Sequence, residues 1–333
     1  MPDSSANASL MTLLDASLQQ AAWYQGGYFN HLPMALHALA ELGASEQRLQ
    51  VWFDHYASRL QPVAAIEPAP DFDPMAHLGE ADTLPACRAF FLKAVEEGDA
   101  LAVARTYWPR LARGPAAAAF HGLIQLAHAL QVGHPGQVAH GLAALTASNC
   151  DLGTPGLSAQ ADSVVQRLVA LRQWRLLLAS QPLSDWIIGR IQWAVNLPGF
   201  AAAACMPEGL TLADLTAACA QLYWQHRNLT ALHMVTACHA YRQITNHLGD
   251  GDLGALWLAL AAAFVAVDED FDPVPPQLPA TLPDWAQLRA KACESDNEHV
   301  IKLTHCCWRE FEHYGWPLHQ AIAARVNGLL VAA

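Results

Sequence analysis

Positive charge is scarce in this sequence of 333 residues. Only 18 lysines and arginines stand against 30 aspartates and glutamates, which gives a formal net charge of −12. The basic residues form no cluster, whereas a protein that neutralises phosphate groups needs a basic surface. We therefore expect no nucleic-acid partner and no binding to anionic membranes.

Long apolar runs are also absent. The longest, from Ala255 to Val267, has aspartates on both sides and is shorter than the ~20 residues that a membrane span needs. It predicts a buried core helix. The N-terminus carries Asp3 and no basic residue before its first apolar stretch, so we expect no signal peptide.

The cysteines lack any paired spacing. Eight are present, scattered from Cys87 to Cys307, and no Cys-x-x-Cys occurs. This excludes a zinc ribbon and a thioredoxin-like motif. Most of the cysteines lie in segments with the apolar periodicity of a helix, where a free thiol behaves as a small hydrophobic group. We infer a reducing, cytoplasmic location.

Motifs of common enzymes are missing or broken. There is no H-E-x-x-H, no G-x-S-x-G and no Walker A sequence. Residues 249–254 match G-x-G-x-x-G, but a long helix precedes them where the dinucleotide fingerprint needs a strand, so we read them as a turn between helices. Asp268, Asp270 and Asp272 imitate the start of a calcium loop, but Pro273 replaces the required glycine.

What the sequence has in abundance is alanine and leucine, both strong helix formers. Period-2 alternation of β-branched residues is nearly absent. We therefore predict an all-α fold without a sheet, as a single globular domain over residues 1–333. The expected helices are 8–22, 33–42, 46–60, 84–97, 99–112, 115–132, 135–147, 158–180, 183–196, 211–226, 229–248, 253–267, 283–293, 298–314 and 317–331.

Prolines and polar caps mark several of these boundaries. Pro33 and Pro115 stand where a first helical turn tolerates proline, and Asp99 and Thr211 are expected N-caps. Two proline-rich segments, residues 61–85 and 268–283, interrupt the helices. We interpret them as long loops across one globule, because the candidate site draws on helices from both sides of each.

Sixteen histidines are present, and several lie inside strongly apolar helices. A buried imidazole needs a specific partner there. The candidates form three pairs: His31 and His37, His121 and His128, and His233 and His239. For any one histidine alone, a hydrogen-bonded core residue or a surface residue is the favoured explanation. As a set they suggest a metal, since imidazole binds iron, zinc, copper and nickel.

The sequence His299-Val300-Ile301-Lys302 is the most specific local feature. On a helix, residues three apart are neighbours, so this imidazole and this amine point to one side. Lys302 has the apolar neighbours Ile301 and Leu303. Burying an ammonium is costly unless it is paired or neutralised.

Four of these segments, residues 30–39, 120–130, 231–242 and 298–303, together resemble the questin oxidase-like family. That family is all-helical and includes fungal enzymes that oxidatively open anthraquinone rings and are described as Baeyer–Villiger-like oxidases. A non-haem iron site of four histidines and a carboxylated lysine has also been described in it. This chain has Gly122 where the fungal proteins tend to have proline, so the anthraquinone substrate is only a precedent.

The resemblance implies an oxygenase that uses O₂ on a polycyclic phenol or quinone and cleaves its ring. It implies Fe²⁺ held by His31, His121, His233, His299 and Lys302, with the lysine as a carbamate. His37, His128 and His239 would orient the ligands or carry protons. The choices of His31 over His37 and of His233 over His239 remain open at this stage.

Two other functions stay in competition with this one. The first is a metal-free Baeyer–Villiger-type oxidase that uses NADPH, although no dinucleotide-binding motif supports it. The second is a helical binding protein without catalytic activity. The sequence shows no regular 34- or 40-residue period, which argues against a helical solenoid.

Overall fold

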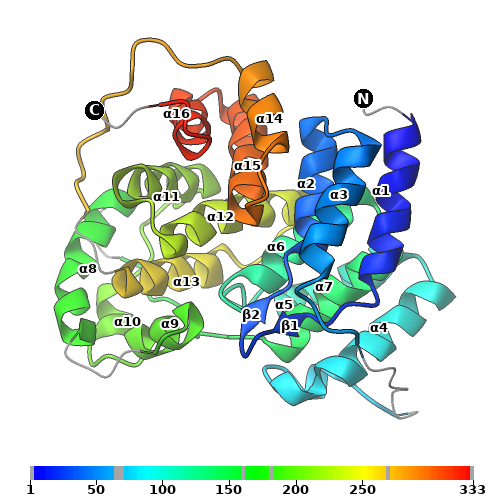
Figure 1. Ribbon diagram of the computed structural model, residues 1–333. Coiled ribbons are helices and arrows are strands. Elements are labelled where there is room, and N and C mark those ends of the chain that lie inside the picture. The colour runs from blue at the N-terminus through cyan, green and yellow to red at the C-terminus, as the bar shows by residue number, and fades with distance from the viewer. Residues whose placement is uncertain (1–3, 64–70, 159–161, 180–183, 268–270, 331–333) are drawn as a thin grey trace.

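The computed structural model describes residues 4–63, 71–158, 162–179, 184–267 and 271–330, and over these residues it is mostly helical (Figure 1). The predicted all-α class is confirmed. The α-helices are α1 (Ser4–Ser17), α2 (Leu32–Leu42), α3 (Glu46–Ala57), α4 (Leu84–Glu97), α5 (Ala100–Leu111), α6 (His121–Val132), α7 (Pro135–Ala147), α8 (Val164–Ala179), α9 (Ile187–Val195), α10 (Phe200–Ala203), α11 (Leu212–His226), α12 (Leu229–Leu248), α13 (Leu253–Ala266), α14 (Trp285–Cys293), α15 (Glu298–Tyr314) and α16 (Pro317–Val326). Two 3-10 turns, Pro74–Ala76 and Ala81–Thr83, precede α4.

A small hairpin departs from this helical pattern. Strands β1 (Trp23–Tyr24) and β2 (Tyr28–Phe29) pair antiparallel, so the expected absence of any sheet does not hold here. Its turn contains Gly26 and Gly27 with φ of +80° and +150°, values that favour glycine. Strands of two residues are too short to show the alternation by which a strand is predicted.

One error in the predicted helices concerns residues 115–120. Helix α6 begins at His121 and not at Pro115. Ala118, Ala119 and Phe120 have φ of 51°, 55° and 71°, a left-handed conformation that costs non-glycine residues roughly 1–2 kcal/mol each. Alanine propensity predicted a helix here, but the burial of Phe120, fully enclosed in the core, holds the chain in a turn.

Other helix ends differ by several residues. Helix α1 ends at Ser17, because Gln20 pairs with Pro62 in an isolated bridge. Helix α8 begins at Val164, and α16 ends at Val326. The short helix α10 was not predicted.

The expected caps are present. Asp99 accepts a hydrogen bond from the N–H of Ala102, and Thr211 forms a capping box with Asp214. Residues 249–252 join α12 to α13, and Asp252 caps α13, so most of the G-x-G-x-x-G sequence is a turn between helices, as predicted, and its last two residues begin α13. The acidic sequence Asp268 to Asp270 lies outside the described residues.

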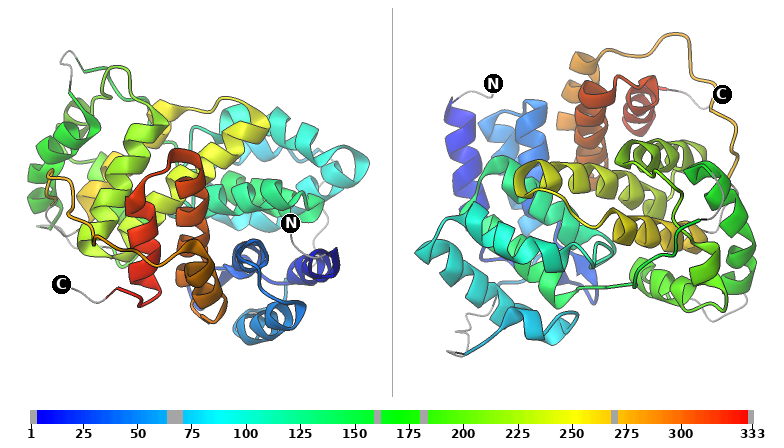
Figure 2. Two further views of the ribbon diagram at one scale, coloured as in Figure 1. Left: turned by 90° about the horizontal axis from the view of Figure 1, so that it is seen from above. Right: turned by 180° about the vertical axis from the view of Figure 1, so that it is seen from behind.

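Four helices from distant parts of the chain surround the candidate site. Helix α2 packs on α6 and α15, and α12 packs on the same two helices. Figures 1 and 2 show α15 standing between α2 and α16. One large buried cluster takes side chains from Phe29 to Ala324, so the site is set into the main core.

The apolar helices of this core stop short of a membrane span. Among the helices in the described ranges, none combines the length and the apolar character needed to cross a bilayer. The run from Ala255 to Val267 is instead buried, as predicted. All eight cysteines are free thiols.

Replacing Gly141 with alanine is expected to destabilise the fold by about 1–3 kcal/mol, because overpacking forces the backbone to move. A Cβ atom at Gly141 of α7 would lie 2.8 Å from the Cα of Leu126 in α6. Thermal unfolding followed by circular dichroism should show a lower midpoint. Gly98→Ala is the control, since its Cβ would make only an ordinary 3.4 Å contact. Equal midpoints for the two variants would contradict the prediction.

Candidate metal centre

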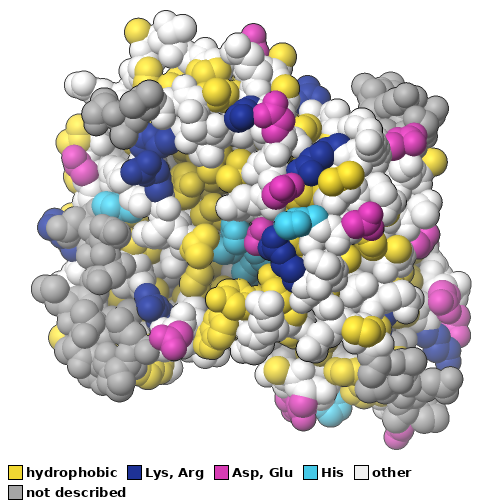
Figure 3. All heavy atoms as spheres, viewed as in Figure 1, with side chains coloured by type: hydrophobic (Ala, Val, Ile, Leu, Met, Phe, Trp, Pro, Cys, Tyr) yellow, Lys and Arg dark blue, Asp and Glu magenta, His cyan; other side chains and the backbone are white. Residues whose placement is uncertain are grey.

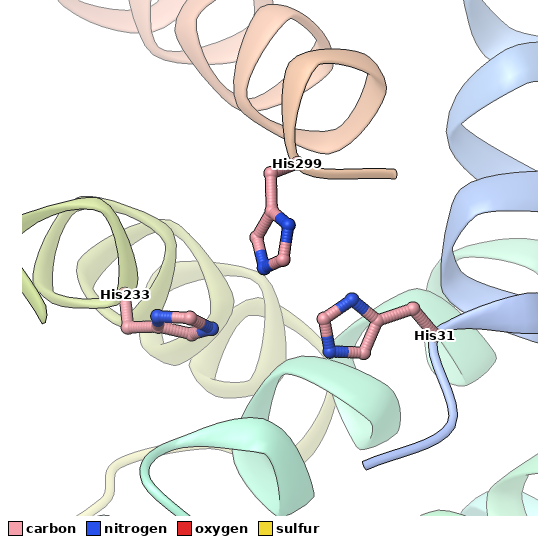
Figure 4. A group of neighbouring side chains, drawn as sticks. All are labelled: His31, His233 and His299. Atoms are coloured by element: carbon pink, nitrogen blue, oxygen red, sulfur yellow. The ribbon is translucent and has the colours of Figure 1, made fainter. Parts of the chain in front are cut away.

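Five predicted site residues come together where α2, α6, α12 and α15 meet, and we call them the outer cluster. His31 precedes α2, His121 begins α6, and His233 lies in α12. His299 and Lys302 lie in the first two turns of α15. Ligand atoms of His31, His233 and His299 lie within 4.8 Å of one another, so this group could hold a metal ion. Figure 4 shows the three rings pointing into a common space.

Two backbone carbonyls determine which nitrogen of His121 and His233 is protonated. The Nδ1 of His121 lies 2.6 Å from the carbonyl oxygen of Ala118, and the Nδ1 of His233 lies 2.6 Å from that of Leu229. A carbonyl oxygen only accepts hydrogen bonds, so each Nδ1 donates and each Nε2 keeps a lone pair. The left-handed turn at Ala118 therefore has a direct role in orienting His121.

The two Nε2 atoms of His121 and His233 lie 3.1 Å apart. With both Nδ1 atoms protonated, two lone pairs face each other in a buried site, which is unfavourable unless a cation lies between them. Two nitrogens bound to one metal at about 2.1 Å stand roughly 3 Å apart. The separation therefore fits a metal ion bound by both.

Burial keeps the histidines of the outer cluster neutral. It is the main cause that lowers the pKa of His233 to about 4 and of His299 to about 2, with Lys302 adding to the effect. The pKa values of His31 and His121 are lowered well below 6.5 by burial and by neighbouring groups. Neutral imidazole is the form that binds a metal.

Lys302 is 2% exposed, and its Nζ lies 3.3 Å from the Nδ1 of His31. Burial lowers its pKa to about 7, although the carboxylate of Glu298 opposes this shift. A substantial fraction of the amine is therefore unprotonated near neutral pH. Glu298 was not singled out from the sequence. Its Oε1 atom lies 3.9 Å from the Nδ1 of His31 and 3.7 Å from the Nδ1 of His299.

An open cavity of about 650 Å³ leads to the outer cluster. Figure 3 shows histidine side chains in a hollow of this face, with hydrophobic side chains beside them. The hairpin contributes Tyr28, whose ring meets that of Trp186 edge-on at 5.5 Å. A Cβ on Gly27 would lie 2.6 Å from the same Trp186 ring. The hairpin and the start of α9 thus form one aromatic wall.

A second group of histidines lies deeper in the same four helices, and we call it the inner cluster: His37, His128, His239 and His305. Each follows its outer counterpart by six or seven residues, which is about two turns or roughly 10 Å along a helix. The Nδ1 atoms of His37 and His128 lie 2.8 Å apart. The ring of His305 lies 5.5–5.6 Å from both of these rings and 5.8 Å from that of His239.

His239 is held by a buried carboxylate. Its Nδ1 lies 2.6 Å from an oxygen of Glu310, which also accepts hydrogen bonds from Arg242. The Nε2 of His239 and both ring nitrogens of His305 are buried without a partner among the described residues. His305 and Glu310 were not singled out from the sequence, although His305 repeats the six-residue interval after His299.

The sequence left open which histidine of a pair lies at the site, and the structure places the two members of each pair in different clusters. His31, His121 and His233 join the outer cluster, and His37, His128 and His239 join the inner one. A buried, convergent set of neutral imidazoles beside an open cavity has the composition of a transition-metal site.

A comparison with known protein families gives one match. The family model described as questin oxidase-like matches residues 28–173, a stretch that carries His31, His37, His121 and His128. The resemblance predicted from the sequence is confirmed over those residues, which include the segments 30–39 and 120–130. This family relationship suggests an oxidoreductase. No curated protein matches the chain.

Proposed function

We propose that this protein is a non-haem, iron-dependent oxygenase that acts on a polycyclic phenol or quinone and cleaves its ring. The observation that supports this most is the pair of Nε2 lone pairs of His121 and His233, 3.1 Å apart in a buried site. His31 and His299 complete the imidazole set, and Lys302 lies beside them.

The donor set favours iron once Lys302 is modified. A protonated lysine has no lone pair to offer, but its pKa of about 7 leaves free amine. The nitrogen lone pair of that amine can attack CO₂, form an N–C bond and release a proton, which leaves a carbamate with anionic oxygens. Histidines together with an oxygen donor are typical of non-haem iron. Iron supplies, when bound, the redox chemistry with O₂ that an oxygenase requires.

The chain's own residues bind and orient the substrate. Tyr28 and Trp186 at the cavity mouth are 55% and 42% exposed, so they offer aromatic surface to a flat ring system. The carbonyl groups of Ala118 and Leu229 hold the two imidazoles in one tautomer. The apolar helices around the cluster exclude water from its inner side.

The inner cluster carries protons in this proposal. His37 and His128 share one hydrogen between two Nδ1 atoms at 2.8 Å, so a proton can move from one ring to the other. His239 is fixed by Glu310 through its Nδ1, which leaves its Nε2 free to accept. These three residues are thus placed to hold or pass a proton behind the outer cluster.

Metal content tests the proposed function. Wild-type protein, loaded anaerobically with Fe(II), is expected to hold roughly one iron per chain by elemental analysis. Lys302→Ala should lower the iron affinity by at least about tenfold, since even the loss of a residue that orients a ligand costs about 10–100-fold. Lys291→Ala is the control, because Lys291 is half-exposed and pairs only with Glu294.

Iron-free wild-type protein after loading would contradict the proposal. In that event, NADPH consumption by metal-stripped protein would favour the metal-free oxidase, and its absence would favour a binding protein. Equal iron in both lysine variants would remove Lys302 from the ligand set.

A further inference from the structure

A second, smaller cavity lies on the other side of Trp23 from the outer cluster. Its volume is about 160 Å³, enough for roughly five water molecules at ~30 Å³ each. It is formed between α1, α4, α6 and α7. Its polar lining includes Ser17, Asn30, Arg88, Gln125 and His140.

Arg88 brings an unneutralised positive charge to this cavity. Its Nε donates to the Nε2 of His140, and its Nη2 donates to the carbonyl oxygen of Leu18 at 2.6 Å. Among the described residues no carboxylate forms an ion pair with it, and burial is the one cause that shifts its pKa. Burial lowers the pKa of Arg88, but a guanidinium stays charged in proteins. A half-buried charge without a counter-ion is costly.

The Nη1 of Arg88 has no protein partner within the described part of the chain. A guanidinium has several N–H donors in a planar fork that fits a carboxylate. The two protein acceptors, His140 and Leu18, use the Nε and one hydrogen of Nη2. Donors therefore remain for a planar anion.

Gln125 adds a second polar group to the lining of this cavity. It lies on α6 and is only 6% exposed. Its side-chain amide makes no hydrogen bond to the described residues and is not among the fully enclosed polar atoms, so it is open to the cavity and can bind a ligand there. The amide N–H group is a donor suited to a carboxylate oxygen.

We propose that this cavity binds a small carboxylate, with Arg88 neutralising its charge and Gln125 donating to one of its oxygens. The volume fits an anion between acetate and a short keto acid in size. Bicarbonate and phosphate share oxyanion chemistry, and the experiment below separates them. This site uses none of the outer cluster residues, so it does not depend on the proposed metal.

The proposed carboxylate site shares a lining residue with a small space beside the inner cluster. Gln125 also lines a space of about 10 Å³ beside His37 and His128, room for about one water molecule. Gln125 would therefore lie between a carboxylate bound at Arg88 and the space beside these two histidines.

Isothermal titration of the purified full chain tests this site. Acetate, pyruvate, bicarbonate and phosphate are compared at constant ionic strength. We expect saturable binding of acetate and pyruvate, weakened at least about tenfold in Arg88→Gln, since hydrogen bonds between charged groups are stronger than those between neutral groups. Arg105→Gln is the control, because Arg105 is exposed and also donates to a backbone carbonyl, that of His247.

The variant Gln125→Leu removes the side-chain amide and leaves the guanidinium of Arg88 in place, so it tests the contribution of the amide separately. Carboxylate affinity several-fold below wild type, with an unchanged melting temperature, would support the site even if Arg88→Gln fails to fold. Equal affinity in wild type, Arg88→Gln and Gln125→Leu would overturn it. So would the absence of saturable carboxylate binding, or binding of phosphate or bicarbonate alone.

Discussion

Lowering the pH from 7 to 5 is expected to unfold this protein. Four buried histidines outside the outer cluster carry the effect. Burial is the main cause that brings the pKa of His37 and of His140 to about 3, and it holds those of His128 and His305 well below 6.5. In the unfolded chain each titrates near 6.5. Between the folded pKa values and pH 6.5, these imidazoles therefore stay neutral in the folded state, whereas in the unfolded state they bind protons.

The direction of the effect follows from this difference. Above pH 6.5 neither state binds these protons, and the stability is fully present. Below pH 6.5 the unfolded state gains protons that the folded state cannot, so stability falls with pH until the folded pKa values are reached. At pH 5, His37 and His140, whose folded pKa values are about 3, cost about 2 kcal/mol each. His128 and His305 act in the same direction, and the stability of a typical domain is only about 5–15 kcal/mol.

Circular dichroism between pH 8 and pH 4, with a metal chelator present, measures this transition. His305→Leu should move its midpoint to lower pH, because one depressed imidazole is removed. His55→Leu changes an exposed histidine of α3 and should leave the midpoint in place. The explanation is refuted if wild-type protein stays folded at pH 4.5. It is also refuted if His305→Leu unfolds at the same pH as wild type.

Glu310→Ala is expected to cost about 3–5 kcal/mol of stability, the effect of breaking a buried ion pair. Glu310 is fully buried and accepts hydrogen bonds from Arg242 and from the Nδ1 of His239. Burial alone would raise its pKa, but these two partners outweigh burial and lower it to about 2. Alanine would leave a buried guanidinium and a buried N–H without an acceptor.

Urea unfolding measured at pH 7.5 gives the comparison. Glu312→Ala is the matched control on the same helix, because Glu312 is 46% exposed and pairs with Arg309 at the surface. Such exposed pairs contribute about 0–1 kcal/mol. Similar losses in the two variants would show that Glu310 has no special structural role.

The sequence predicted local structure well where caps and periodicity agree. Helices α12 and α15 begin and end where they were expected, since Asn228 and Asn297 cap them and glycines follow. The turn at Ala118 to Phe120 could not be predicted, because alanine favours a helix and only the tertiary burial of Phe120 opposes it.

The candidate site was predictable in its residues but not in its arrangement. Apolar surroundings identified the histidine pairs and Lys302. The two members of a pair lie about two turns apart on a helix, so which of them lies beside the cavity depends on which end of each helix reaches it, and a single sequence does not contain that information. Glu298 and Glu310 escaped notice because acidic residues on a helix usually face solvent, and only packing shows that Glu310 is buried.

The outer cluster joins segments that are far apart along the chain, at residues 31, 121, 233 and 299. An ion bound there would act as a multiple cross-link. Closing a single loop of about 100 residues lowers the entropy of the unfolded chain by the equivalent of roughly 4–5 kcal/mol in the chain-entropy description. The cysteines of this chain form no disulfides. A bound metal ion would stabilise the fold as disulfides stabilise secreted proteins, by restricting the conformations of the unfolded chain.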